Sequence, residues 1–453
     1  MVKNIDIENN LTVINPEIAE VIDKMSGAIL PVKEVIGSDY DRVIKLRSEL
    51  LTFIKRNEPR YICPLCHTPV YLVCRHETRR FFFRHKIDDG SCTIDTRNMS
   101  EKEINARKYN GAKESEAHKQ MKKVIADSLK ADGRFSSPEI EQVWKNQKTG
   151  EWKIPDVSAT FDDKVQIAFE IQLSTTFLRV IVDRKEFYLK DGGLLCWIFK
   201  EIKEEYPRLM QDDIFYNNNY NLFIASEETL QISNNQKRLF LKCCWFEPVI
   251  EDKKIINTWQ NQIVSFEQLT FDREHQRIFF FDYEREKQKL TQQLDRERFE
   301  EFWLSNNLNL YSEDISQEWQ ELSASLSKQG ISLPNQNDIN DIYNGGGFTS
   351  LLNALYSAKY GKSIGYKFSK LIQVAHLIED KYKGYLKIFG WALKQYGRKE
   401  QIEGEDSSGK WAEKVKKFKL LMQSHDERYQ HNKYFDELIS FLFPELAERV
   451  KKL

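Results

Sequence analysis

The chain has 453 residues, of which 41% are hydrophobic and 30% are charged, which is the composition of a globular protein with more than one core. The 68 Lys and Arg residues nearly balance the 69 Asp and Glu residues, so net charge does not indicate a nucleic-acid partner. No apolar run approaches the roughly 20 residues of a membrane-spanning helix, and the first residues do not resemble a secretory signal. We therefore expect a cytoplasmic protein that does not enter membranes, whose seven cysteines are reduced and serve burial or metal binding.

The N-terminal segment, residues 1–60, combines short β-like runs with one helix. Apolar residues at helical spacing predict that helix between Asp41 and Ile54. The members of this apolar stripe are Val43, Leu46, Leu50 and Ile54.

Cysteine and histidine residues cluster in the next segment, residues 61–110. Cys63 and Cys66 form a C-x2-C pair, the spacing that lets one tight turn direct two thiolates at one ion. With His85 and Cys92 they make a Cys3His set, which predicts a closed, tetrahedral, structural Zn2+ site. The alternative is a small β-module whose reduced cysteines bind no metal.

Other residues of this segment admit two interpretations. His67, Cys74 and His76 are spare ligand types, but Cys74 ends an alternating run that predicts a strand, so a packed thiol is expected there. Five cations are interleaved with the aromatic residues 81–83: Arg75, Arg79, Arg80, Arg84 and Lys86. They favour contact with a nucleic-acid backbone, and a solvated strand edge is the equal alternative.

Two alternating segments carry the sharpest chemical signal. Every second residue from Val165 to Leu173 is apolar, which predicts a strand from Lys164 to Ser174 with Glu170 and Gln172 projecting from its other face. Upstream, Asp156 follows a proline and opens a second alternating segment, Val157–Phe161. Two aspartates supply turn residues between the segments, so we expect a hairpin that brings Asp156 and Glu170 within reach of one cation.

A predicted helix from Glu114 to Leu129 precedes these strands. Glu114 and His118 are four residues apart and border its apolar stripe, so Glu114 is a candidate third acid. His118 is either a substrate contact or an ordinary helix-surface histidine.

Such a set of acids suits phosphodiester hydrolysis, which needs a metal-activated water and neutralisation of developing negative charge. Mg2+, or Mn2+ in its place, is typically held by one or two carboxylates together with water and substrate phosphate. Asp156 and Glu170 are therefore the predicted direct ligands. Glu114 is expected to bind through water or at a second metal position, and Gln172 to orient the attacking water or contact the phosphate.

Residues 60–200 resemble the CoiA-like family of competence proteins, and their acids resemble a PD-(D/E)xK active site in its E-x-Q variant. The matching residues are Glu114, His118, Pro155-Asp156, Glu170-Ile171-Gln172, Arg184, Tyr188, Gly192-Gly193 and Trp197-Ile198. The resemblance implies a restriction-endonuclease-like core, an α/β (α+β) mixed sheet flanked by helices. It also implies an upstream zinc element and the acidic set Glu114, Asp156 and Glu170.

The same resemblance places Gln172 where most relatives carry lysine. A neutral amide stabilises developing negative charge less well than an ammonium group, and Lys122, one turn beyond His118, is a candidate substitute. Arg184 and Tyr188 are expected on the helix after the catalytic strand, facing the DNA backbone or the site. The alternative for Tyr188 is packing against the sheet.

The remaining chain offers no further catalytic constellation. Residues 111–285 are expected to form the nuclease-like domain, with strands continuing from 213 to 283, and residues 286–453 an all-helical domain suited to dimerisation or partner binding. Cys243 and Cys244 are expected to be buried thiols. The predicted function is metal-dependent cleavage of DNA, which the resemblance associates with anti-phage defence or processing of incoming DNA. The alternatives are a non-catalytic DNA-binding scaffold acting with a partner helicase or ATPase, and an RNase.

Overall fold

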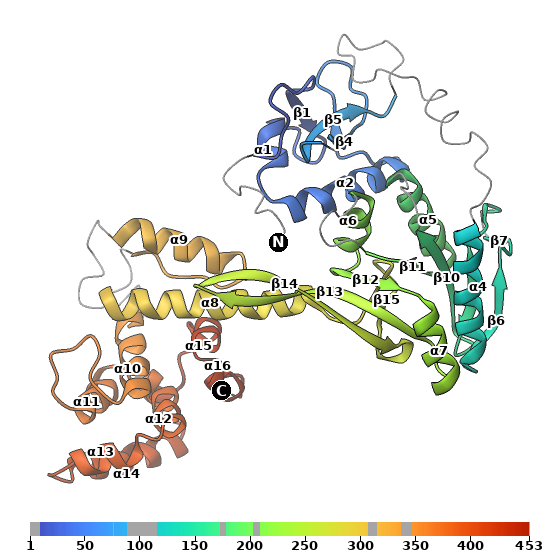
Figure 1. The fold of residues 1–453 in the computed structure, drawn as a ribbon. Helices are drawn as coiled ribbons and strands as arrows, with labels where there is room; N and C mark the ends of the chain where they lie inside the picture. The colour runs from blue at the N-terminus through green and yellow to red at the C-terminus, as the bar shows by residue number, and fades with distance from the viewer. Residues whose placement is uncertain are drawn as a thin grey trace. The chain divides into compact units, whose positions relative to one another are not determined.

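The computed structural model describes residues 10–75, 77–87, 116–147, 149–172, 178–202, 209–306, 315–336 and 347–452. The chain forms two compact units, one of Met1–Glu251 and Ile255–Lys287 and the other of Asp252–Lys254 and Gln288–Leu453 (Figure 1). It is a mixed α+β protein whose C-terminal region is helical. Within the described ranges, none of the helices has the length and apolar character needed to cross a membrane.

A seven-stranded mixed sheet forms the centre of the first unit, in the order β14-β13-β12-β11-β10-β9-β6. Its strands are β6 (Phe135–Ile140), β9 (Val157–Phe161), β10 (Val165–Gln172), β11 (Leu194–Phe199), β12 (Asn221–Ile224), β13 (Phe240–Glu251) and β14 (Lys254–Ser265). Strands β10, β11 and β12 are parallel neighbours, whereas β9 runs antiparallel to both β10 and β6. Asp162 and Asp163 connect β9 to β10 with φ angles of 49° and 53°, as a primed hairpin turn requires. The predicted hairpin is thus confirmed.

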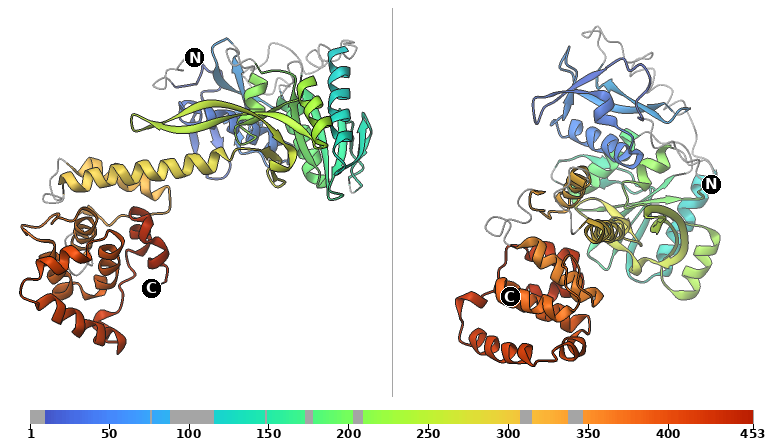
Figure 2. Two further views of the ribbon diagram at one scale, coloured as in Figure 1. Left: turned by 60° about the horizontal axis from the view of Figure 1, so that its bottom comes forward. Right: turned by 90° about the vertical axis from the view of Figure 1, so that its left-hand side faces the viewer.

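Helices cover both faces of this sheet (Figure 2). They are α4 (Glu116–Ala131), α5 (Leu178–Asp191), α6 (Leu209–Phe215) and α7 (Glu227–Gln236). The apolar stripe of α4 packs with Ile167, Phe169 and Ile171 of β10 in one core. On the other face, Tyr188 of α5 packs against Ala168 of β10. The predicted alternation along β10 is therefore confirmed, since successive residues lie against different helices.

Helix α7 corrects the expectation that residues 213–283 contain only strands. Ser226 caps the helix and forms a reciprocal capping box with Thr229. Two of its buried residues, Thr229 and Ser233, are polar. The apolar periodicity that identifies a helix in a sequence is consequently weak here.

The N-terminal part of this unit holds a three-stranded sheet, β2-β1-β3, and a separate β4-β5 hairpin. Its elements are β1 (Glu20–Asp23), β2 (Ile29–Pro31), α1 (Val32–Ile36), α2 (Tyr40–Lys55), β3 (Tyr61–Ile62), β4 (Val70–Arg75) and β5 (Arg80–His85). Val21 and Tyr61 belong to one buried cluster. The expected boundary near residue 60 therefore does not separate two cores.

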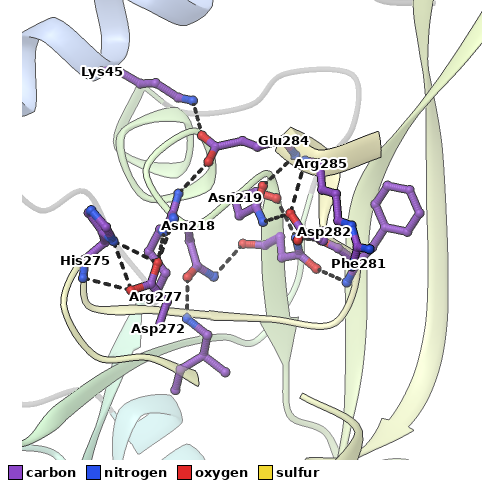
Figure 3. Close-up of polar contacts among 12 residues, drawn as sticks. Lys45, Asn218, Asn219, Asp272, His275, Arg277, Phe281, Asp282, Glu284 and Arg285 are labelled. Atoms are coloured by element: carbon purple, nitrogen blue, oxygen red, sulfur yellow. Dashed lines mark hydrogen bonds and ion pairs between the residues drawn. The ribbon is translucent and has the colours of Figure 1, made fainter. Parts of the chain in front are cut away.

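Ion pairs connect α2 to the sheet domain. Arg47 meets Asp213 of α6 at 2.6 Å, and both side chains are buried. Lys45 binds Glu284 at 2.7 Å, and Glu284 also accepts from Arg277 at 2.8 Å (Figure 3). Arg47 and Asp213 are paired at close range, so neither is buried as an uncompensated charge, whereas Lys45 and Glu284 remain partly exposed.

Two short hairpins complete the first unit. They are β7 (Trp144–Lys145) with β8 (Trp152–Lys153), and β15 (Thr270–Asp272) with β16 (Arg277–Phe279). A 3-10 helix, η1 (Phe266–Gln268), follows β14.

The second unit is built from helices around its own apolar core. They are α8 (Tyr283–Asn306), which begins in the first unit, α9 (Ser316–Ser327), α10 (Phe348–Tyr360), α11 (Leu371–Lys381), α12 (Leu386–Gln395), α13 (Lys399–Glu405), α14 (Lys410–Gln423), α15 (Asp436–Leu442), α16 (Pro444–Val450), η4 (Lys383–Tyr385) and η5 (Glu427–Tyr429). Large aromatic side chains, such as those of Trp303 and Phe348, lie fully buried in this core.

Candidate functional site

Asp156 stands at the entry to β9, where three groups hold its carboxylate. The backbone N–H of Ile171 in β10 donates to its Oδ2 at 2.8 Å. From α4, His118 Nε2 lies 3.3 Å from the same oxygen and Lys122 Nζ lies 3.4 Å from Oδ1. Burial raises the pKa of Asp156, but the bonds from His118 and Ile171 and the Lys122 charge together bring it below its usual value. Asp156 is therefore an ionised acceptor.

Lys122 is a buried cation between two acids. Its Nζ contacts Glu141 at 2.6 Å as well as Asp156, and its side chain is 6% exposed. The sequence singled out Lys122 as the substitute for a lysine at position 172, and the ammonium group does lie beside a predicted metal ligand. Glu141 was not singled out, because it follows β6 in an irregular stretch with no motif around it.

Glu170 projects from β10 toward α5 and is 1% exposed. Its Oε1 accepts a hydrogen bond from the Tyr188 hydroxyl at 2.9 Å and forms an ion pair with Arg184. Burial, together with the nearby charge of Asp156, raises the pKa of Glu170 to about 8, although Arg184 and Tyr188 lower it. Arg184 also donates to the carbonyl of Ile154 at 3.3 Å, so one guanidinium joins this acid to the chain just before Asp156.

The two acids are therefore electrostatically coupled, Glu170 within β10 and Asp156 directly before β9. Asp156 is bonded to the residue directly after Glu170, and its negative charge is felt at Glu170. The oxygens are those that Mg2+ or Mn2+ prefers, and their present partners are protein cations. Gln172 ends β10 in a half-buried position opposite Phe199. Glu114 lies outside the described residues.

A buried tryptophan braces the helix that carries Arg184 and Tyr188. Trp144 packs edge-on against Tyr188, with ring centroids 5.0 Å apart, and its Nε1 donates to Asp191 at 2.6 Å. A Cβ at Gly193 would come within 2.5 Å of the same indole. This contact fixes the β7-β8 hairpin on α5. No sequence motif selects Trp144, because its partners Tyr188 and Asp191 are distant from it in the chain.

A second candidate site lies in the N-terminal part of this unit. Cys63, Cys66 and His85 each offer a ligand atom, and these atoms lie within 4.8 Å of one another. Within the described ranges they are the single group of three or more His, Cys, Asp or Glu side chains arranged in this way. Cys63 and His85 are fully buried, and Cys66 Sγ is 3.5 Å from His85 Nε2. Three predicted ligands are thus adjacent, while Cys92, the fourth, lies outside the described residues.

The spare ligand types of this segment occupy other positions. Cys74 is 7% exposed and packs in the core, as expected for a thiol on β4. Burial raises its pKa to about 11. His67 is exposed in a left-handed conformation with φ 57°, and His76 lies outside the described residues. These observations leave Cys63, Cys66 and His85 as the described donor set.

The basic stretch beside this site is partly committed to internal contacts. Arg79 binds Asp212 at 2.7 Å and the Tyr40 hydroxyl at 2.9 Å, and Arg80 donates to two backbone carbonyls. Arg75 remains more than half exposed. At least two of the five cations therefore stabilise the fold, which leaves less charge for a phosphate backbone than their number suggests.

Comparison with protein families finds three matches along the chain. Residues 27–99 match a domain of unknown function (DUF7830), residues 100–284 another (DUF6035), and residues 276–445 a third (DUF7829). Comparisons with curated proteins and with solved structures find no match. The chain is thus similar, segment by segment, to three domain families, and the two candidate sites fall within different ones.

Proposed function

We propose that this chain is a metal-dependent nuclease that hydrolyses DNA phosphodiester bonds, with Asp156 and Glu170 as ligands for Mg2+ or Mn2+. The observation that carries the proposal is the coupled pair of carboxylates, one directly before β9 and one in β10. Lys122 and His118 contact Asp156, and Arg184 contacts Glu170. A mixed sheet with helices on both faces, as β6, β9, β10 and β11 form with α4 and α5, is also what the PD-(D/E)xK resemblance requires.

The residues of the cluster have separate roles in metal binding, charge stabilisation and orientation of the water. A bound Mg2+ would lower the pKa of a water and offset negative charge on the phosphate. Asp156, already ionised, and Glu170, after losing its proton, hold the cation. Lys122 offsets charge that develops on the phosphoryl oxygens. Arg184, once Glu170 has another partner, is placed to meet a substrate phosphate, and Gln172 at the end of β10 orients the water.

We further propose that Zn2+ bound by Cys63, Cys66 and His85, with Cys92 as fourth ligand, serves structure. Two thiolates and an imidazole are donors that Zn2+ prefers, and a site filled by four protein ligands leaves no position for substrate. The site supports the core in which Cys63 packs.

The test uses isosteric variants of the full chain. Linear, circular and single-stranded DNA and RNA of the same sequence are incubated with wild type, Asp156→Asn and Glu170→Gln in Mg2+ or Mn2+. We expect each variant to lose at least about 100-fold in cleavage rate. Asp163→Asn, an exposed change in the β9-β10 turn, is the matched control and should cleave like wild type. Equal cleavage by all four proteins would show a contaminating nuclease and reject this site.

A specific observation supports a second candidate, a non-catalytic DNA-binding scaffold that works with a partner helicase or ATPase. Arg184 already occupies Oε1 of Glu170, and position 172 supplies no charge. If this ion pair is permanent, Glu170 cannot bind a metal. Binding of DNA by the wild type without metal-dependent cleavage would favour this function over the nuclease.

A further inference from the structure

The β7-β8 hairpin carries two tryptophans, one buried and one exposed to solvent. Trp144 is 5% exposed and is held against α5, whereas Trp152 is 60% exposed. All nine tryptophans of the chain lie in its described part, and Trp152 is the only exposed one among them. One indole therefore anchors the hairpin and the other is presented to solvent.

Strand pairing places a cation beside the exposed indole. Trp152 lies directly opposite Lys145, and directly opposed residues of an antiparallel pair project from the same face. Lys145 is itself exposed. Trp144 and Lys153 form the other opposed pair and share the face that packs on α5. The outer face of the hairpin thus combines an open aromatic ring with a positive charge.

Exposed apolar residues also flank the hairpin in the chain. They are Ile140 at 46% and Val143 at 53% before or at the start of the hairpin, and Ile154 at 40% directly after β8. Single exposed apolar residues are ordinary on protein surfaces, but a local group of them marks an interaction site. A ligand that fits this surface offers a flat apolar face to Trp152 and a negative charge to Lys145.

Residues on both sides of the hairpin are bonded to the carboxylate cluster. Directly after β8, the carbonyl of Ile154 accepts a hydrogen bond from Arg184, the partner of Glu170. Before β7, the backbone N–H of Glu141 donates to the carbonyl of Asp156 at 3.2 Å. Trp152 is four residues before Asp156. Trp152 therefore belongs to a hairpin segment whose two ends are bonded to the site where the proposed nuclease holds its metal.

We propose that Trp152 is a stacking platform for an unpaired base, with Lys145 meeting the adjacent phosphate. Bases stack on exposed aromatic rings largely without regard to sequence, and a cation on the same face suits the phosphate. A base inside a duplex cannot offer its face to a side chain. The substrate class that fits is thus single-stranded nucleic acid, or a duplex end or junction with splayed bases. This inference rests on the proposed nuclease function for its choice of ligand.

The experiment measures binding separately from cleavage. Full-length protein carrying Asp156→Asn and Glu170→Gln is titrated into fluorescein-labelled single-stranded oligo(dT) of about 16 nucleotides, or into a blunt duplex, with anisotropy as the readout. Adding Trp152→Ala should weaken single-strand binding by about 10-fold to 100-fold, and Trp152→Phe should retain most of the affinity. Duplex affinity should be nearly unchanged. The control Tyr434→Ala, an aromatic side chain with 74% exposure, should bind like its parent.

The outcomes separate the two proposals. Unchanged single-strand binding by Trp152→Ala, or no single-strand binding by the parent, overturns the platform. If the wild type cleaves DNA in that case, the nuclease proposal stands without it. If Trp152→Ala weakens binding although the wild type cleaves nothing, the platform stands and the nuclease proposal fails. Thermal unfolding of Trp152→Ala should match that of its parent, because the side chain is mostly in solvent.

Discussion

The two candidate metal sites of this chain differ in what surrounds their ligands. Cys63, Cys66 and His85 approach one another with all ligand atoms within 4.8 Å. In the carboxylate cluster each acid has a protein cation instead, Lys122 for Asp156 and Arg184 for Glu170.

The difference follows from the chemistry of the donors. A thiol and an imidazole can be buried as neutral groups, and the pKa of Cys63 is raised by burial despite backbone N–H groups that lower it. A carboxylate that stays ionised when it is buried, as Asp156 does, needs a counter-charge. The thiol site can therefore bind a metal by losing protons alone. At the acidic site a metal ion must also displace a protein cation, Lys122 or Arg184, from its carboxylate. Such an exchange suits a metal ion that binds reversibly.

The largest expected effect is loss of Zn2+ from the N-terminal site. Cys63→Ser together with Cys66→Ser should abolish bound zinc and unfold the surrounding core, because a structural zinc site stabilises its module by several kcal/mol. Elemental analysis and thermal unfolding by circular dichroism measure both effects. His67→Asn, an exposed change at a left-handed position in the same turn, is the control. If elemental analysis finds no zinc bound to the purified wild-type protein, the assignment of Cys63, Cys66 and His85 as zinc ligands is wrong.

A smaller effect should identify Glu170 as a metal ligand. Arg184→Met leaves Glu170 without its cation and should lower the free energy of unfolding by about 1–3 kcal/mol. If Mg2+ can replace the lost charge, millimolar Mg2+ should restore part of this loss in urea unfolding. The matched control is Arg56→Met, which breaks the ion pair of α2 with the buried Glu186 of α5 at 2.9 Å. Mg2+ should not rescue that variant; equal responses of the two would remove the reason to place a metal at Glu170.

The smallest effect, taken over one pH unit, is a pH dependence of the contact between Arg47 of α2 and Asp213 of α6. Burial raises the pKa of Asp213 to about 7, although its partner Arg47 lowers it. The folded state therefore binds more protons than the unfolded state between about pH 4 and 7, and the free energy of unfolding should fall as pH rises through that window. The fall should be less than about 1.4 kcal/mol per pH unit. Asp213→Asn should flatten this part of the urea-unfolding profile, and parallel profiles would show that Asp213 does not titrate there.

Local features of the fold could be predicted from the sequence, because backbone geometry imposes them. Strand β9 has the predicted bounds, Val157–Phe161, and β10 lies within the predicted run, since alternation reports directly on a strand with two different faces. Strand β13 runs from Phe240 to Glu251, and its burial alternates poorly. No period of two therefore marks its bounds in the sequence.

The sequence predicts which residues belong to the candidate site, but it does not predict which of their side chains contact one another. Asp156, Glu170 and Arg184 were selected by their order along the chain, and all three belong to the cluster. The sequence does not reveal that Arg184 contacts Glu170, or that Lys122 lies between two acids. Such pairings depend on how α4 and α5 pack across the sheet, and motif spacing carries no information about that packing.

The contact between Gly193 and Trp144 has a consequence for how the chain can vary. A methyl group at position 193 would stand 2.5 Å from the indole, so the ring would have to shift. The beginning of β11 therefore sets a minimum separation between that strand and the hairpin. Trp144 also packs on Tyr188, whose hydroxyl donates to Glu170. A Gly193→Ala substitution would therefore shift the side chains around Glu170 without changing any charged group.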